Sequence, residues 1–83
     1  MILNESKNKY KTFHIHQDNW YEHGNSIAFY TERNDGTRLS KPIYIPKSQI
    51  IKDDTNSMGI TTFRISDWIL RQKLLRGYRL TEW

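Results

Sequence analysis

One tight turn is the feature that most constrains the fold of this chain. The segment Asn34-Asp35-Gly36-Thr37 lies between two stretches in which apolar and polar residues alternate. An Asp-Gly pair tolerates the positive φ angles of a tight hairpin turn, and alternation is typical of a strand with one buried face. The turn therefore predicts an antiparallel hairpin with one strand over 26–33 and a returning strand over 38–45.

Further strands follow from the same patterns. Residues 10–16 alternate and residues 60–65 are β-branched and aromatic, so each segment predicts a strand. Residues 78–83 alternate enough for a short final strand. Because proline cannot donate to a strand ladder, Pro42 and Pro46 indicate that the returning strand of the hairpin lies at an edge or leaves the sheet there.

Polar segments between these strands predict loops. Residues 17–25 combine Asn, Asp and Gly around Trp20-Tyr21, which indicates a loop anchored by aromatic side chains. Residues 48–52 predict a short turn or strand, and the acidic residues 53–57 predict a polar loop.

One helix is expected near the C-terminus. Ser66 suits the N-cap, where its side chain accepts from free backbone N–H groups, and Asp67 suits the positive end of the helix dipole. The helix should cover 67–76 and stop at Gly77. Together these elements predict an α+β fold: a small, strongly curved antiparallel sheet or partial β-barrel of about four to five strands, closed by one short C-terminal helix.

The small size of the chain limits its possible functions. Its 83 residues, of which 36% are hydrophobic, predict a single domain over 1–83 with a flexible arm over 1–9. There is no cysteine, which excludes disulfides, thiolate zinc sites and thiol catalysis. No apolar run approaches the length of a membrane span and no signal-peptide pattern opens the chain, so we expect a cytoplasmic protein with no membrane partner.

No group of residues has the spacing of a catalytic or metal site. His14 and His16 share one face of a predicted strand, but suitably spaced third and fourth zinc ligands are missing. Lys47-Ser48 lacks the glycine-rich loop that precedes a phosphate-binding lysine, and Asp53-Asp54 lacks a partner acid. We therefore expect a protein that is not an enzyme and needs no cofactor or metal.

The net charge of +4 is concentrated at the two ends of the chain. Residues 64–83 carry five basic and two acidic residues, and residues 1–13 carry three basic residues and one acidic residue. Residues 14–63 are close to neutral. A basic patch favours a polyanionic partner because neutralised phosphates release counterions. The alternative is an ordinary solvated surface.

An aromatic and basic face is the strongest candidate for a binding site. With the aliphatic residues of the predicted hairpin turned inward, the outer face carries Ala28, Tyr30, Arg38, Ser40 and Tyr44. Such rings stack on unpaired bases while cations contact phosphate. The predicted nucleic-acid or ligand site comprises His14, His16, Tyr30, Arg38, Tyr44, Lys47, Ser48, Gln49, Arg71 and Arg76. The alternative is that Tyr30 and Tyr44 pack beneath the helix or the terminal strand.

The segment Tyr44-Ile45-Pro46-Lys47-Ser48-Gln49-Ile50 also offers a charge, a hydroxyl and an amide in succession. These groups can hydrogen-bond a phosphate or a partner backbone, or they can tie the turn to its own backbone. With Ile65-Ser66-Asp67-Trp68-Ile69-Leu70 and Gly77, this segment resembles short phage and prophage proteins over residues 26–77. The resemblance implies a small phage-encoded accessory protein of unassigned activity, acting in the bacterial host cell. The helix departs from the pattern because it is basic where acidic residues are expected.

Two alternatives to nucleic-acid binding stay open. The first is a phage counter-defence inhibitor, similar to anti-CRISPR proteins, that binds a host immune protein or sequesters its nucleotide signal. Aromatic side chains anchor protein interfaces well, so the interface candidates are Trp20, Tyr21 and Trp83. The second is a structural subunit that completes its core by forming a homo-oligomer.

Overall fold

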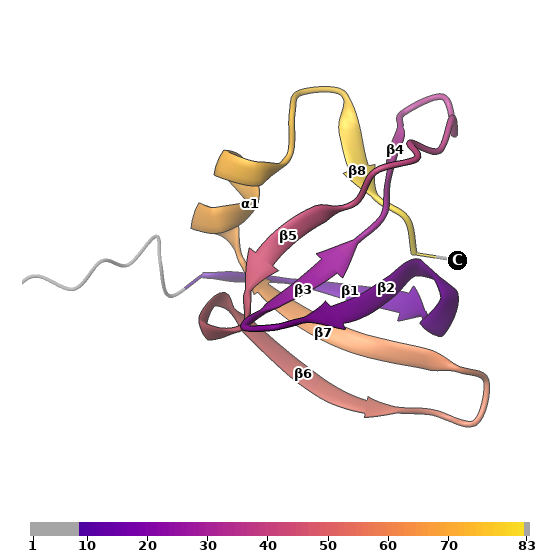
Figure 1. The fold of residues 1–83 in the computed structure, drawn as a ribbon, viewed down its shortest axis with the longest axis vertical. Helices are drawn as coiled ribbons and strands as arrows, with labels where there is room; N and C mark the ends of the chain where they lie inside the picture. The colour runs from indigo at the N-terminus through magenta and orange to yellow at the C-terminus, as the bar shows by residue number, and fades with distance from the viewer. Residues whose placement is uncertain (1–8, 83) are drawn as a thin grey trace, which may run out of the picture.

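The computed structural model describes residues 9–82, which form eight strands, two 3-10 helices and one α-helix (Figure 1). The strands are β1 (Tyr10–His16), β2 (Trp20–His23), β3 (Ser26–Phe29), β4 (Thr31–Arg33), β5 (Ile43–Pro46), β6 (Ile50–Thr55), β7 (Ile60–Ser66) and β8 (Tyr78–Leu80). The helices are η2 (Gln17–Asn19), η3 (Lys47–Gln49) and α1 (Asp67–Lys73). The flexible arm predicted over 1–9 lies almost wholly outside the described residues.

The strands form three antiparallel sheets with the orders β1-β7-β6, β2-β3-β5 and β4-β8. The predicted α+β class with mainly antiparallel strands is confirmed. The prediction of one curved sheet of four to five strands is wrong, because the strands form three small sheets, and no closed barrel is present among residues 9–82.

The predicted strand over 26–33 is divided at Tyr30. The Tyr30 N–H donates to the Asn19 carbonyl at 3.1 Å, and the Tyr30 carbonyl accepts from the Thr81 N–H at 2.9 Å. Before Tyr30 the chain pairs with β2 and β5, and after it the chain pairs with β8. This change of partner separates β3 from β4.

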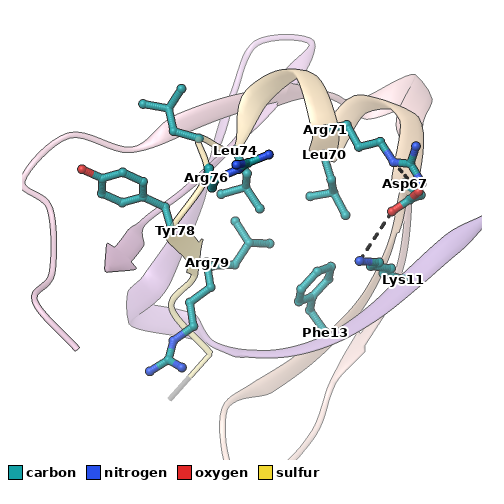
Figure 2. Close-up of a pocket in the computed structure, with 12 residues that line it drawn as sticks. Lys11, Phe13, Asp67, Leu70, Arg71, Leu74, Arg76, Tyr78 and Arg79 are labelled. Carbon is teal, nitrogen blue, oxygen red and sulfur yellow. Dashed lines mark ion pairs between the residues drawn. The ribbon is translucent and has the colours of Figure 1, made fainter. Parts of the chain in front are cut away.

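The helix begins where expected, but the contacts that stabilise its first turn differ from those predicted. Ser66 occupies the N-cap as predicted, but its side chain makes no capping hydrogen bond, and its buried hydroxyl finds no partner among the described residues. The Asp67 N–H instead donates to the Lys9 carbonyl at 2.9 Å. The Asp67 carboxylate pairs with Lys11 at 3.6 Å and with Arg71 at 2.9 Å (Figure 2). The contacts with Lys9 and Lys11 attach the helix to β1 and the residue before it, whereas the pair with Arg71 lies within the helix.

The end of the helix comes earlier than predicted. α1 stops at Lys73 because Leu74 adopts extended backbone angles, although its N–H still bonds the Leu70 carbonyl at 2.8 Å. Gly77, at φ +89°, turns the chain into β8. β8 covers part of the final strand predicted over 78–83.

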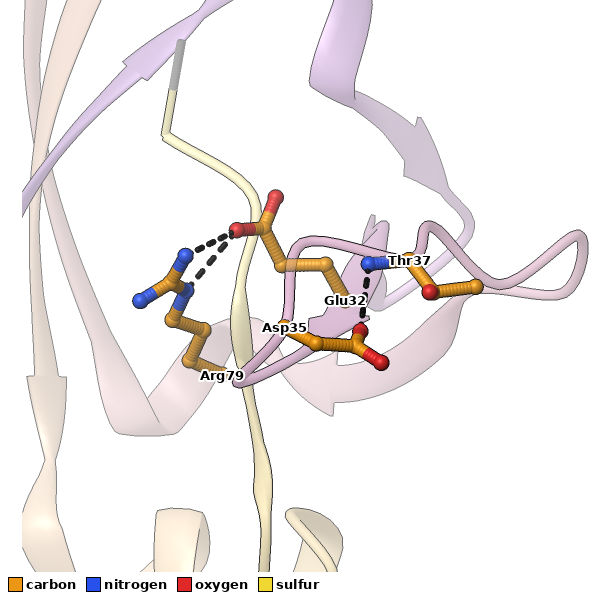
Figure 3. A network of polar contacts seen from close by, with 4 residues as sticks. All are labelled: Glu32, Asp35, Thr37 and Arg79. Carbon is orange, nitrogen blue, oxygen red and sulfur yellow. Dashed lines mark hydrogen bonds and ion pairs between the residues drawn. The ribbon is translucent and has the colours of Figure 1, made fainter.

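The predicted hairpin turn is confirmed. Gly36 has φ +92°, and the Arg33 N–H bonds the Thr37 carbonyl at 2.8 Å. The Thr37 N–H donates to Asp35 Oδ1 at 2.9 Å, which lowers the pKa of Asp35 (Figure 3). The returning strand is less regular than predicted: an isolated bridge joins Glu32 to Arg38, and regular pairing with β3 begins only at β5.

Two strands lie where loops were predicted. β2 occupies part of the predicted loop over 17–25 and pairs with β3, and only Gln17–Asn19 leaves the extended conformation before it. β6 includes Asp53 and Asp54, which were assigned to a polar loop. Their charges are tolerated because β6 is an exposed edge strand with a register shift between Lys52 and Thr55.

Phe63 joins the two three-stranded sheets. It comes from β7, is fully buried, and meets the rings of Trp20 and Phe29 edge-on with ring centroids 5.0 Å apart in each case. The remaining core residues are Ile15, Ile27, Ile45, Ile65, Ile69, Leu70 and Leu80. No helix among residues 9–82 is long and apolar enough to cross a membrane.

Replacing Phe63 tests this packing. We expect Phe63→Leu to lower the free energy of unfolding by about 2 kcal/mol, because both edge-to-face contacts are lost and a small void remains. Urea unfolding measures the change. The control Met58→Ala, at a side chain that is 73% exposed, should change stability by less than about 0.5 kcal/mol. Equal effects of the two substitutions would show that Phe63 does not hold the sheets together.

Candidate nucleic-acid interface

Two tyrosines close over an alanine on the outer face of the β2-β3-β5 sheet. The strand register places Ala28 opposite Tyr21 on one side and opposite Tyr44 on the other. The two tyrosine hydroxyls lie 3.3 Å apart, so the side chains meet. Ala28 beneath them is fully buried. The small alanine side chain leaves room for both rings.

Further rings extend this pair in both directions. The His23 ring lies 4.9 Å from the Tyr44 ring, and the Tyr30 ring lies 6.3 Å from the Tyr21 ring. Arg38 places its guanidinium 4.6 Å from the centre of the Tyr30 ring, a cation–π distance. We call this set the aromatic strip: His23, Tyr44, Tyr21, Tyr30 and Arg38.

The strip faces solvent. Tyr21 is 38% exposed and Tyr44 is 40% exposed, so neither the helix nor the terminal strand covers them. Tyr30 is half-buried, and its backbone contacts the chain after β8. The opposite face of the sheet carries Phe29 and Ile45 into the core.

The structure thus brings together three of the predicted site residues, Tyr30, Arg38 and Tyr44. Tyr21, which the sequence suggested as a protein-interface residue, belongs to the same strip. His23 was missed because its segment was assigned to a loop. The two-residue spacing of Tyr21 and His23 is the signal that could have placed both rings on one face of a strand.

Lys47, Ser48 and Gln49 follow directly on β5 in η3. Lys47 Nζ lies 2.6 Å from Glu22 Oε1, and this hydrogen bond and the lysine charge lower the pKa of Glu22. Lys47 therefore already has an anionic partner. Within residues 9–82 we find no hydrogen bond from the side chain of Ser48 or Gln49, so neither is seen to tie the turn to its own backbone.

The histidines of β1 lie in the other three-stranded sheet. His14 Nδ1 is 3.1 Å from Thr62 Oγ1, and His16 Nδ1 accepts the Asp18 N–H at 3.1 Å. Neither histidine joins the aromatic strip. In the part of the chain that the structure describes, no group of three or more His, Asp or Glu side chains is arranged to hold a metal ion.

Arg71 and Arg76 are also separate from the strip. Both line a cavity beside α1 whose walls include no residue of the strip. Trp20, a predicted interface residue, is half-buried, and its ring packs against Phe63 at the edge of the hydrophobic core. Trp83 lies outside the described residues. The predicted set of site residues therefore divides into several surfaces.

Comparison with known proteins adds no relative. No protein-family model, no curated protein and no solved structure matches this chain. The resemblance to phage accessory proteins stays a prediction.

The contact between the two tyrosine hydroxyls can be tested by titration. The hydrogen bond to Tyr44 raises the pKa of Tyr21 above its usual value near 10.0, because ionised Tyr21 can no longer donate to it. We expect Tyr44→Phe to shift the pKa of Tyr21 downward, as followed by NMR of ring-labelled tyrosine. Tyr10→Phe, on β1, should leave it unchanged. A pKa of Tyr21 that does not respond to Tyr44→Phe would contradict the contact.

Proposed function

We propose that the protein binds single-stranded nucleic acid along the aromatic strip. The observation that carries this proposal is a continuous line of four rings and one guanidinium on the solvent side of a sheet whose other side is core. The rings lie on β2, on β5 and at the junction between β3 and β4, and the guanidinium comes from the segment between β4 and β5. Stacking of bases on such rings is sequence-tolerant, because every base has a π-face.

The geometry of the rings suits stacking. The His23 and Tyr44 planes are inclined at 47°, and those of Tyr21 and Tyr30 at 52°. Because these rings are tilted and do not cover one another face to face, parts of their faces remain open to a base. The rings are attached to a hydrogen-bonded sheet, so binding would cost little additional conformational entropy.

Charge supports the same partner. Arg38 lies over Tyr30 at one end of the strip, where it can contact a phosphate next to a stacked base. The Glu22–Lys47 pair adds no contact to the strip, because Glu22 is one residue from Tyr21 and therefore lies on the other face of the sheet. The groups that could read a base edge are few, so we expect weak sequence preference.

The affinity for a fluorescein-labelled oligothymidylate, measured by fluorescence anisotropy, tests the proposal. With one phosphate neutralised by Arg38, we expect the Kd to rise about threefold between about 50 mM and about 200 mM salt. Tyr44→Leu, which keeps Ala28 covered, should weaken binding about tenfold through lost stacking. Arg38→Gln should remove most of the salt dependence.

Matched controls separate the strip from the rest of the surface. Tyr10 on β1 is 41% exposed, close to the exposure of Tyr44, so Tyr10→Leu should leave the affinity unchanged. Arg64→Gln, at an exposed arginine of β7, should leave the salt dependence unchanged. Absence of binding at low salt, or equal losses for Tyr10→Leu and Tyr44→Leu, would refute the proposal.

A protein partner is the second candidate, and the exposure of Tyr21 and Tyr44 favours it. Exposed tyrosines on a rigid sheet are typical anchors of protein interfaces. In this version the aromatic strip binds a host immune protein and blocks a site on it, as a counter-defence inhibitor would. A stoichiometric protein captured from host lysate, retained after nuclease treatment and lost with Tyr21→Ala, supports it. Retention with Tyr21→Ala would count against the strip as the interface.

A further inference from the structure

A cavity of about 400 Å³ lies between α1, β1 and the segment that leads into β8 (Figure 2). Its apolar wall is made by Phe13 of β1, Leu70 and Leu74 at the helix, and Leu80 of β8. Leu70 and Leu80 are buried core residues, and the other two are partly buried against the same core. The cavity therefore opens directly onto the hydrophobic core, in a size range typical of small-ligand sites.

Cationic side chains surround this apolar wall. Lys11, Arg71, Arg76 and Arg79 line the cavity, against one lining carboxylate, that of Asp67. Asp67 is shared by Lys11 and Arg71. Figure 2 shows this group on one side of the apolar side chains and Arg76 on the other. The positive charge beside an apolar wall favours a ligand that combines an anionic group with an apolar body.

Arg76 is the cation best placed to hold an anionic group. The Arg79 guanidinium is turned toward Glu32, with Nη2 and Oε2 2.7 Å apart (Figure 3). Lys11 and Arg71 are engaged with Asp67. Within residues 9–82, no carboxylate forms an ion pair with Arg76, although it lies beside the apolar wall. A ligand anion there would not have to displace an internal partner.

We propose that this cavity binds a small amphiphilic anion: a hydrocarbon body with one carboxylate or phosphate group, such as a medium-chain alkyl carboxylate. The body lies against Phe13, Leu70 and Leu74, and the anionic group contacts Arg76. This site is distinct from the aromatic strip, and the proposal does not depend on nucleic-acid binding.

Titration of the ¹⁵N-labelled protein with decanoate, decyl phosphate and decyltrimethylammonium, each below its micelle concentration, tests the site. We expect the amide signals of Leu70, Leu74 and Leu80 to shift with at least one of the two anions. The cation should bind at least about tenfold more weakly, because it meets the basic rim. If only one anion binds, that result identifies the anionic group. Equal affinity for the cation, or shifts confined to other residues, would overturn the proposal.

Two variants locate the anionic group. Arg76→Gln should weaken binding of the anion about threefold, because one exposed ion pair is lost. Leu75→Glu, at a lining side chain that is 71% exposed, should also weaken it by placing a negative charge at the cavity. Lys73→Gln removes a neighbouring helix charge that does not line the cavity, and should leave binding unchanged. Equal losses for Arg76→Gln and Lys73→Gln would show a general charge effect and refute the assigned role of Arg76.

Discussion

The packing of Phe63 against Trp20 and Phe29 is the contact on which the rest of the structure depends. These three rings come from β7, β2 and β3, so they join the two three-stranded sheets across the core. A chain with 36% hydrophobic residues has few large side chains for this purpose, and aromatic rings bury the most area per residue. Part of the aromatic content is therefore required by the fold.

Alternation along β2 places its neighbouring aromatic residues on opposite faces of the sheet. Trp20 faces the core, and Tyr21, one residue later, faces solvent. The register with β3 then sets Tyr21 beside Ala28, and β5 brings Tyr44 to the other side. Core formation and assembly of the aromatic strip thus follow from the same strand pairing. A shift of β2 by one residue would exchange the two faces and remove the strip.

The positive charge of the chain has more than one structural role. Lys11 holds the helix to β1 through Asp67, Arg71 pairs with the same carboxylate within the helix, and Arg79 joins β8 to β4 through Glu32. These cations are partly neutralised by the fold. Arg38 and Arg76 are different, since Arg38 lies over a ring and Arg76 lies at the rim of an apolar cavity. Position, more than net charge, therefore distinguishes the two candidate binding surfaces.

Local features of the sequence determined a substantial part of this protein. The Asp35-Gly36 turn, the strands β1 and β7 and the start of α1 were predictable because each depends on residues close together in the chain. The outward positions of Tyr30, Arg38 and Tyr44 also followed from alternation. The polar composition of β2 and β6 concealed two strands, because edge strands tolerate charged side chains that are typical of loops.

Only the tertiary structure decided which strands pair and which surfaces they form. β1 pairs with β7, so His14 lies opposite Thr62, far along the chain and away from the tyrosines. The break at Tyr30 depends on hydrogen bonds to Asn19 and Thr81, which no local pattern contains. Sequence alternation specifies which side chains share a face of one strand. Strand partners and register are chosen by packing between distant segments, and that packing placed Tyr21 with Tyr44 and separated both from Arg71 and Arg76.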